Sequence, residues 1–207
     1  MLKFHRGSGK SMIAGILIVC ALLLFHASPY AAKSCHTVFL PWVSTPPIPL
    51  PNGDFESQPV IWSFLPKDAF LIFAQNELPE SIVPRSGTHV AWLGDQGDQS
   101  QSHLTEISQT VTLPGNDPVL RFWVWIQSSE PCDMTRDQLR VYSKKELEFS
   151  LDICKEKSTN SWAEKIVKLT GMQDDTVMLR IQVETVNSNP YSPASEVFLD
   201  DFIFATH

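Results

Sequence analysis

The chain has 207 residues and a formal net charge of −7 at pH 7, from 16 Lys and Arg against 23 Asp and Glu. Hydrophobic residues make up 43% and charged residues 19%, a balance that argues against an intrinsically disordered chain and a multi-span membrane protein. One globular domain is expected instead. Because an acidic chain repels phosphate backbones, no nucleic acid is expected as a partner, whereas divalent cations are compatible with the charge.

The first segment, residues 1–32, has the pattern of an export signal. A basic start is followed by a run of fourteen apolar residues, Met12 to Phe25. That run is shorter than the about 20 residues that a membrane span needs. We therefore expect a secreted or cell-surface protein. A cleaved signal peptide is favoured over an uncleaved membrane anchor, which would be the protein's only contact with a membrane.

Export places the cysteines in an oxidising compartment, where thiols pair. Cys20 lies in the signal segment, which leaves three cysteines. Cys132 and Cys154 both fall inside the folded region, at the edges of expected strands, whereas Cys35 precedes a proline-rich stretch. We therefore expect a disulfide between Cys132 and Cys154, with Cys35 free or paired to another chain.

Residues 33–51 are expected to form a spacer. The stretch "PWVSTPPIPLP" holds five prolines in eleven residues. Proline fits neither a helix interior nor a central strand, so this stretch is expected to be extended and to contribute no strand. The domain is therefore predicted to begin at Asn52 and to cover residues 52–207.

Beyond Asn52, turn signals separate short apolar and β-branched runs, the pattern of a β protein. In one run, Leu147, Phe149, Leu151 and Ile153 alternate with polar residues, which predicts a strand with one buried face. Such runs predict an all-β fold, an antiparallel β-sandwich of the jelly-roll type. The eight candidate strands are residues 88–93, 106–113, 120–126, 138–142, 147–153, 162–169, 176–184 and 196–204.

A tryptophan in this chain either packs in the core or contacts a ligand, because large aromatic rings are usually buried but also stack on sugars. Trp123 and Trp125 share one face of the run "LRFWVWI" and are expected to pack inside the sandwich or under loops. Trp92 is expected in the core. Trp62 and Trp162 flank loops, so they are the candidate ligand-binding residues.

Several motifs together resemble a known family: "NGDFES…W" at 52–62, "SGTHVAWLG" at 86–94, "ISQTVTLPG" at 107–115, "LRFWVWI", and the terminal "VFLDDFIF". They are similar to galactose-binding-like jelly rolls, a group that includes many carbohydrate-binding modules and the MAM-like domains of secreted bacterial proteins. The resemblance covers residues 52–204. The segment from Cys132 to Cys154 is closer to the MAM-like subgroup, and this departure leaves a glycan ligand open against a protein ligand.

The resemblance also implies a structural calcium ion. In the carbohydrate-binding relatives the first and last strands lie side by side, and an acidic residue from each holds the ion. The matching residues here are Glu56 and Asp200, with Asp54 and Asp201 as further candidates. Independently, calcium takes six to eight oxygen ligands, which clustered carboxylates can supply. The alternative is that these side chains are solvated or hydrogen-bond a neighbouring turn.

The usual sequence motifs of hydrolases, P-loop proteins and dinucleotide-binding proteins do not occur in the chain. We therefore expect an exported, non-catalytic binding or adhesion module, stabilised by calcium, that recognises a glycan or an extracellular protein. Two alternatives stay open. One is a structural or assembly domain without a small ligand, and the other is a small secreted hydrolase.

Overall fold

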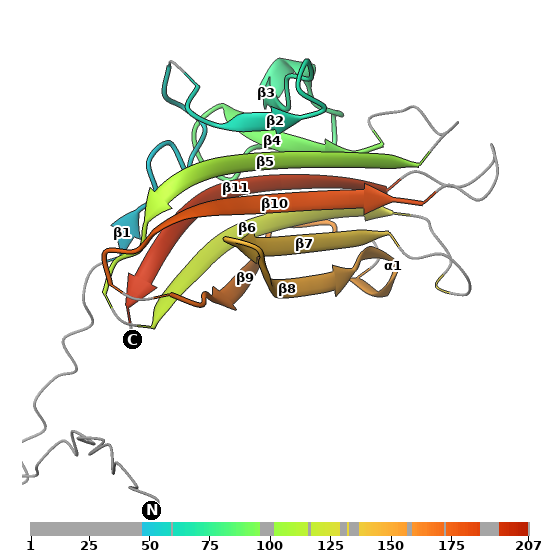
Figure 1. Ribbon diagram of the computed structural model, residues 1–207. Helices are drawn as coiled ribbons and strands as arrows, with labels where there is room; N and C mark the ends of the chain where they lie inside the picture. Colours follow the sequence, from blue (N-terminus) through green and yellow to red (C-terminus); the bar gives the residue numbers. More distant parts are fainter. Residues whose placement is uncertain are drawn as a thin grey trace, which may run out of the picture. The chain divides into compact units, whose positions relative to one another are not determined.

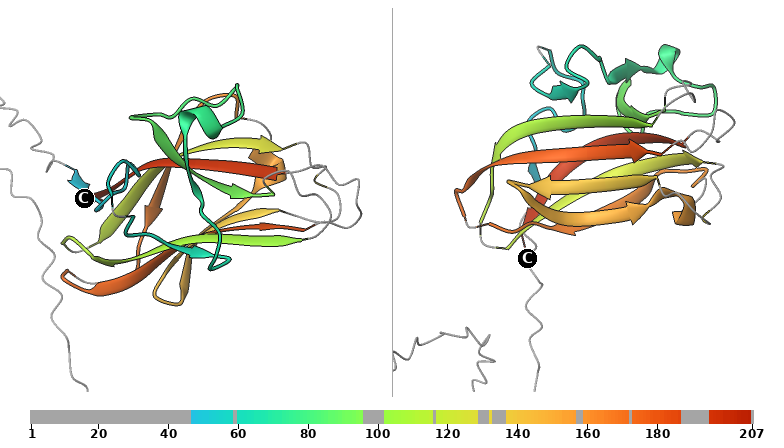
Figure 2. Two further views of the ribbon diagram at one scale, coloured as in Figure 1. Left: turned by 90° about the horizontal axis from the view of Figure 1, so that it is seen from above. Right: turned by 45° about the vertical axis from the view of Figure 1, so that its right-hand side comes forward.

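In the computed structural model, the described strands form two antiparallel sheets that pack face to face (Figures 1 and 2). No helix in the described part of the chain is long and apolar enough to cross a membrane. The export signal, Cys35 and most of the spacer lie outside the described residues. Those residues are 47–58, 60–95, 102–115, 117–128, 132, 137–156, 159–171, 173–186 and 195–206.

The first sheet, sheet A, runs in the order β3-β4-β11-β6-β9, with β1 paired to β11. The second, sheet B, runs in the order β2-β5-β10-β7-β8. A 3₁₀ turn, η1 (Gln75–Glu77), follows β3, and a single helical turn, α1 (Ile153–Glu156), follows β8. The strands are β1 (Ile48–Pro49), β2 (Ser63–Leu65), β3 (Ile72–Ala74), β4 (His89–Gly94), β5 (His103–Thr112), β6 (Pro118–Ser128), β7 (Gln138–Ser143), β8 (Glu146–Asp152), β9 (Ala163–Lys168), β10 (Thr176–Thr185) and β11 (Ser195–Thr206).

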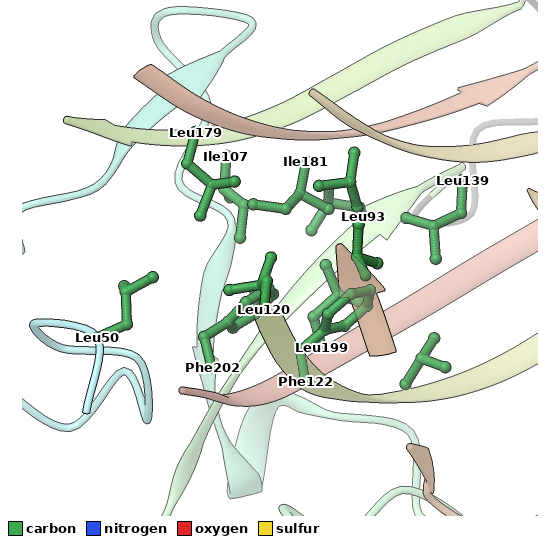
Figure 3. Packing of buried hydrophobic residues seen from close by; sticks show 14 of the residues in the cluster. Leu50, Leu93, Ile107, Leu120, Phe122, Leu139, Leu179, Ile181, Leu199 and Phe202 are labelled. Atoms are coloured by element: carbon green, nitrogen blue, oxygen red, sulfur yellow. The ribbon is translucent and has the colours of Figure 1, made fainter. Parts of the chain in front are cut away.

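The core fills the space between the sheets with the inward side chains of the longer strands (Figure 3). Phe122, Val124 and Ile126 of β6 are buried there opposite Leu179 and Ile181 of β10. Alternation produces this arrangement, because successive side chains of a strand point to opposite faces. Each such side chain contributes about 1.5–3 kcal/mol when fully buried. The predicted antiparallel β-sandwich is confirmed.

A bulge in β11 brings the two ends of the domain together. The pairing of β11 with β6 shifts between Asp200 and Ile203, and Asp201 takes a positive φ of 52°. This turns Phe202 into the core, where its ring stacks on Phe122 at 5.0 Å between centroids. The N–H of Phe202 donates to the carbonyl of Gly53 at 2.9 Å. The turn "NGDF" is thereby fixed against the last strand.

The domain begins before Asn52, which corrects the predicted boundary. Ile48 and Pro49 pair with the end of β11, and Leu50 is buried in the core with 2% of its surface exposed. Pro49 is tolerated because β1 is a short, peripheral strand, where a missing N–H costs little. The side chain of Gln109 also donates from Nε2 to the carbonyl of Pro51 at 3.0 Å. The last residues of the expected spacer are therefore part of the fold.

The alternation predicted for residues 147–153 is interrupted. The pairing of β7 with β8 shifts between Val141 and Tyr142, so that Phe149 and Leu147 stand opposite two consecutive residues of β7. Leu147 consequently turns out of the sandwich and is 53% exposed. Ile153 is buried, but as the first residue of α1. The expectation of four inward residues on one strand is wrong at its two ends, because a bulge and a helical turn break the period of two.

A disulfide joins Cys132, in the segment after β6, to Cys154 in α1, with their Cα atoms 5.4 Å apart. This is the pairing expected from the sequence. It ties the connection between β6 and β7 to the turn that leaves β8.

We predict that removing residues 47–51 destabilises the domain. A chain starting at Asn52 loses the pairing of β1 and the burial of Leu50, about 1.5–3 kcal/mol for the leucine alone. Its melting temperature should fall by about 5 °C or more relative to a chain starting at residue 47. Thermal unfolding followed by circular dichroism measures the difference. Equal melting temperatures would show that residues 47–51 contribute nothing to stability.

We also predict that replacing both disulfide cysteines by serine costs about 3 kcal/mol, because the unfolded chain regains the freedom that a loop of this size restricts. Urea unfolding of the double variant, compared with the unmodified chain, gives the loss. Peptide mapping without reductant should recover Cys132 and Cys154 in one linked pair. Recovery of either residue linked to Cys35 would contradict the assignment.

Candidate functional site

The connection between β3 and β4, residues 75–88, crosses the outer face of sheet A, and we name it the strap. Its ends are close together, since the N–H of Gln75 donates to the carbonyl of Thr88 at 2.8 Å. Three of the four acidic residues predicted to bind calcium hydrogen-bond the C-terminal end of the strap and the first residue of β4.

Glu56 holds the junction between the strap and β4. Its Oε1 accepts the N–H groups of Thr88 and His89, both at 2.7 Å. Its Oε2 lies 3.0 Å from the hydroxyl of Thr88 and 3.1 Å from Nδ1 of His89. Burial raises the pKa of Glu56, but these hydrogen bonds outweigh that effect, and the pKa lies below its ordinary value. The carboxylate is therefore ionised when it binds the strap.

Asp200 and Asp201 hold the preceding residues of the strap. Oδ2 of Asp200 accepts the N–H of Arg85 at 2.9 Å and that of Ser86 at 3.2 Å. Asp201 pairs with the Arg85 guanidinium and accepts the hydroxyl of Ser86 at 2.7 Å. Asp200 is completely buried, and burial together with the charge of Asp201 raises its pKa to about 7, against the effect of its backbone hydrogen bonds.

The predicted calcium ligands differ in what they contact. Asp54 is exposed and accepts the N–H of Glu56 within its own turn, at 3.3 Å. Glu56 contacts Thr88 and His89, whereas Asp200 contacts Arg85. Among the described residues, no group of three or more His, Cys, Asp or Glu side chains is arranged to hold a metal ion. Calcium binding at this place stays a prediction from the sequence.

The strap closes the aromatic outer face of sheet A. Ile82, at the centre of the strap, is buried in a second cluster with Val90 and Phe198, against which Trp92, Trp125 and other rings pack. The guanidinium of Arg85 lies 4.0 Å from the ring centroid of Trp123. The expectation that Trp123 and Trp125 share a face and pack under a loop is confirmed. Trp92 belongs to this outer cluster and not to the main core.

The two predicted ligand-binding tryptophans are largely engaged in packing. Trp62 is only 4% exposed, lies between Phe55 and Phe202, and donates from Nε1 to the carbonyl of Asn52 at 2.9 Å. The prediction that Trp62 forms a ligand-binding platform is therefore wrong, because the "NGDF" turn folds over its ring.

Trp162 is half-buried. Its ring meets that of Trp125 edge-on, with centroids 5.9 Å apart, and its Nε1 donates to the carbonyl of Val83 at 2.8 Å. Trp162 thus supports the strap from the side. Its role as a ligand platform stays a prediction.

Sheet B presents a different face. In Figure 1 no described strand or helix lies in front of β5, β10, β7 and β8. The side chains that alternate with the buried core positions of these strands point outward, and they are polar or charged over the middle of the sheet. This open face was not predicted as a site, although the alternation in residues 176–184 places Arg180, Gln182 and Glu184 outward.

The outward side chains of the open face are joined by hydrogen bonds from strand to strand. Gln138 of β7 donates to Asp152 of β8 at 3.2 Å and accepts from Nε of Arg140 at 2.8 Å. Arg140 in turn donates to Glu184 of β10 at 2.6 Å. These contacts hold one amide, two carboxylate groups and one guanidinium in fixed positions across three strands.

A second set continues the row toward β5. The guanidinium of Arg180 lies 4.7 Å from the ring centroid of Tyr142 and 3.8 Å from a carboxylate oxygen of Glu106. Gln182 donates to the same carboxylate at 2.5 Å. Each arginine is thus paired with a glutamate, so the open face offers ordered donors and acceptors with little net charge.

The chain matches no protein-family model and no curated protein. Among solved structures, it is similar to the carbohydrate-binding module TmCBM61 in complex with β-1,4-galactotriose, with a TM-score of 0.52 and 16% identity over 76% of this chain and 97% of that one. The K2 cleaved adhesin domain of Lys-gingipain gives a TM-score of 0.48 and 14% identity, covering 75% of this chain and 97% of the adhesin chain.

A Stig cyclase, Fisc from Fischerella sp. TAU, gives a TM-score of 0.48 and 12% identity, with 78% of this chain and 97% of that chain covered. The likeness to TmCBM61 confirms the fold predicted from the sequence motifs. The chain has the β-sandwich fold found in carbohydrate-binding modules.

We predict that Gly87→Ala destabilises the domain by more than about 2 kcal/mol. Gly87 has a φ of +55°, which costs a residue with a Cβ about 1–2 kcal/mol, and that Cβ would lie 2.4 Å from the carboxyl carbon of Glu56. Urea unfolding measures the loss. Gly115→Ala is the control, because Gly115 also has a positive φ, +69°, but lies outside the strap. Equal losses in the two variants would argue against a tight contact between Gly87 and Glu56.

Proposed function

We propose that this chain is an exported, non-catalytic binding module that recognises a neutral glycan through the open face of sheet B. The observation that carries the proposal is two hydrogen-bonded sets of planar side chains, one from Asp152 to Glu184 across β8, β7 and β10, and one that joins Gln182 of β10 to Glu106 of β5. The fold that the chain shares with TmCBM61, which that structure shows with galactotriose, is consistent with such a role.

The chemistry of this row suits sugar hydroxyls. Amide and carboxylate groups offer both donors and acceptors, which a ring carrying several hydroxyl groups can satisfy at once. The contacts of Arg140 with Gln138 and Glu184 already fix these side chains, so a ligand would not bear the entropy cost of ordering them. Tyr142 adds an aromatic ring, and Arg180 lies over it.

The charge of the open face favours an uncharged ligand. Arg140 is paired with Glu184, and Arg180 lies beside Glu106. A sulfated or uronic-acid glycan would have to separate these pairs or face their carboxylates. A neutral oligosaccharide can instead hydrogen-bond to the pairs while leaving them intact.

An extracellular protein is the alternative partner. Stable protein interfaces are depleted of charged residues at their centre, whereas the centre of the open face holds Arg180, Glu106 and Gln182. Exposed apolar side chains such as Met178 and Leu147 lie on strands of the same sheet. A protein partner would therefore be expected to contact these two residues more than the central row.

The calcium ion predicted at Glu56 and Asp200 is not needed by this proposal and stays a prediction. Any such ion would contact the strap on sheet A, while the proposed ligand face belongs to sheet B. Glycan binding should consequently be insensitive to calcium.

We predict that a glycan array probed with the chain in calcium and in chelator identifies neutral oligosaccharides in both conditions. For the oligosaccharide so identified, Arg180→Gln and Tyr142→Ala should each weaken binding about tenfold or more by calorimetry, since a lost contact of about 1.4 kcal/mol gives that factor.

Arg121→Gln is the matched control for Arg180→Gln. Arg121 is also an arginine in an ion pair on the outward side of a strand, with Glu164, but it belongs to sheet A. Its substitution should leave affinity unchanged. Binding only to anionic glycans, or full affinity in both sheet B variants, would contradict the proposal.

A further inference from the structure

We infer that the carboxylates of Glu56, Asp200 and Asp201 close the strap over the tryptophan face directly, and that the domain needs no metal ion for this. The inference concerns sheet A and is independent of the ligand proposed for sheet B. Three features support it. The N–H groups of residues 85–89 point at the carboxylates, the carboxylate oxygens already accept hydrogen bonds, and the strap covers aromatic residues of sheet A.

The residues from Arg85 to His89 form an anion-binding backbone. The N–H groups of Arg85 and Ser86 point at Asp200, and those of Thr88 and His89 point at Glu56. Between the two pairs, Gly87 has a φ of +55°. Successive N–H groups around a left-handed residue form a concavity that attracts anions. A cation beside these N–H groups would face the positive ends of their dipoles.

The carboxylate oxygens have few lone pairs left for a metal ion. An oxygen of a carboxylate has about two lone-pair sites. Oε1 of Glu56 accepts two N–H groups, and Oε2 lies within hydrogen-bonding distance of the Thr88 hydroxyl and His89 Nδ1. Oδ2 of Asp200 likewise accepts two N–H groups, and its Oδ1 accepts the N–H of Asp201 at 2.8 Å. A calcium ion would have to displace several of these donors.

Gly87 makes the fit between strap and carboxylate specific. Any Cβ at this position would lie 2.4 Å from both the carboxyl carbon and Oε1 of Glu56. The carboxylate therefore packs directly on the glycine backbone. Such an approach leaves no space for an ion between Glu56 and this part of the strap.

The middle of the strap, around Ser81 and Val83, is held by other contacts. The carboxylates therefore fix the C-terminal end of a segment that is also anchored in its middle. The side chain of Gln127 donates to the hydroxyl of Ser81 at 2.8 Å, and Trp162 donates to the carbonyl of Val83. Ile82, between these anchors, is buried on the aromatic cluster. Loss of the carboxylate contacts should release the end near Arg85 first and expose the rings beneath.

The test compares melting temperatures of the chain, stripped of metal beforehand, in calcium and in chelator. We expect the two to agree within about 1 °C, because a calcium ion would have to displace N–H donors that Glu56 and Asp200 already accept. Glu56→Gln should lower the melting temperature by about 5 °C or more, equally in both conditions, since it weakens charge-assisted hydrogen bonds. Ser86→Ala, which removes one hydroxyl donor, should give a smaller decrease and serves if Glu56→Gln does not fold.

Asp54→Asn is the matched control. It removes a carboxylate from the same turn as Glu56, but Asp54 is exposed and hydrogen-bonds within that turn. Its melting temperature should stay within about 1 °C of the unmodified chain, as expected for a surface substitution.

Limited trypsin digestion reports on the strap itself. Arg85 lies at its clamped end, so cleavage after Arg85 should be slow in the unmodified chain and at least several-fold faster in Glu56→Gln and Ser86→Ala. Cleavage after Lys144, in the turn between β7 and β8, provides the internal reference.

A calcium-dependent rise in melting temperature of several degrees that Glu56→Gln abolishes would overturn the inference in favour of a bound ion. Variants that melt like Asp54→Asn would overturn it as well, because the carboxylates would then not hold the strap. Neither outcome bears on the glycan proposal, whose variants lie on sheet B.

Discussion

The arrangement of this domain depends on the insertion of Phe202 between the sheets. A bulge at Asp201 turns the Phe202 ring onto Phe122, and the N–H of Phe202 binds the carbonyl of Gly53. Gly53 has no Cβ, which would otherwise lie 2.2 Å from the carbonyl oxygen of Phe202. This contact joins the first turn of the domain to its last strand. The aromatic side chains of Phe55 and Trp62 then complete the core around it.

The same bulge decides where the acidic side chains point. With the regular period of two, Asp200 and Asp201 would lie on opposite faces of β11. The left-handed conformation of Asp201 instead lets both carboxylates reach Arg85 and Ser86 of the strap. Glu56, held close by the docked turn, reaches the next residues of the same segment. One backbone irregularity therefore places Phe202 in the core and also lets the carboxylates contact the strap.

The two outer faces of the sandwich consequently have different roles. Sheet A is covered by the strap, and its tryptophans stabilise that cover. Sheet B stays open, and its outward residues hydrogen-bond to one another across strands, as Arg140 does with Glu184. A face with ordered polar groups and balanced charge is suited to a hydroxyl-rich ligand. Trp62 and Trp162, the two residues that the sequence suggested as a sugar platform, belong instead to the core and to the covered side.

Several features that the sequence suggested incorrectly share one cause, which is contact between distant segments. Trp62 was expected beside a loop as an exposed ring, but the turn at Asn52 folds over it. Leu50 falls in the segment predicted to be an extended spacer, but β11 pairs with Ile48 and Pro49, and Leu50 is buried in the core. Leu147 was expected inside, but a bulge in the pairing with β7 turns it outward. No local pattern encodes these partners.

By itself, the sequence determined the fold class, the eight longer strands, the inward face of β10, and the cysteine pair. These follow from the period of two, from turn residues and from the position of the cysteines, all of which are local properties. Only the tertiary structure decided that Glu56 and Asp200 bind N–H groups of one strap, and that Arg180 and Tyr142 lie together on an open face. The physical reason is that such contacts depend on which strands become neighbours, and register between distant strands is set by the packing of the whole core.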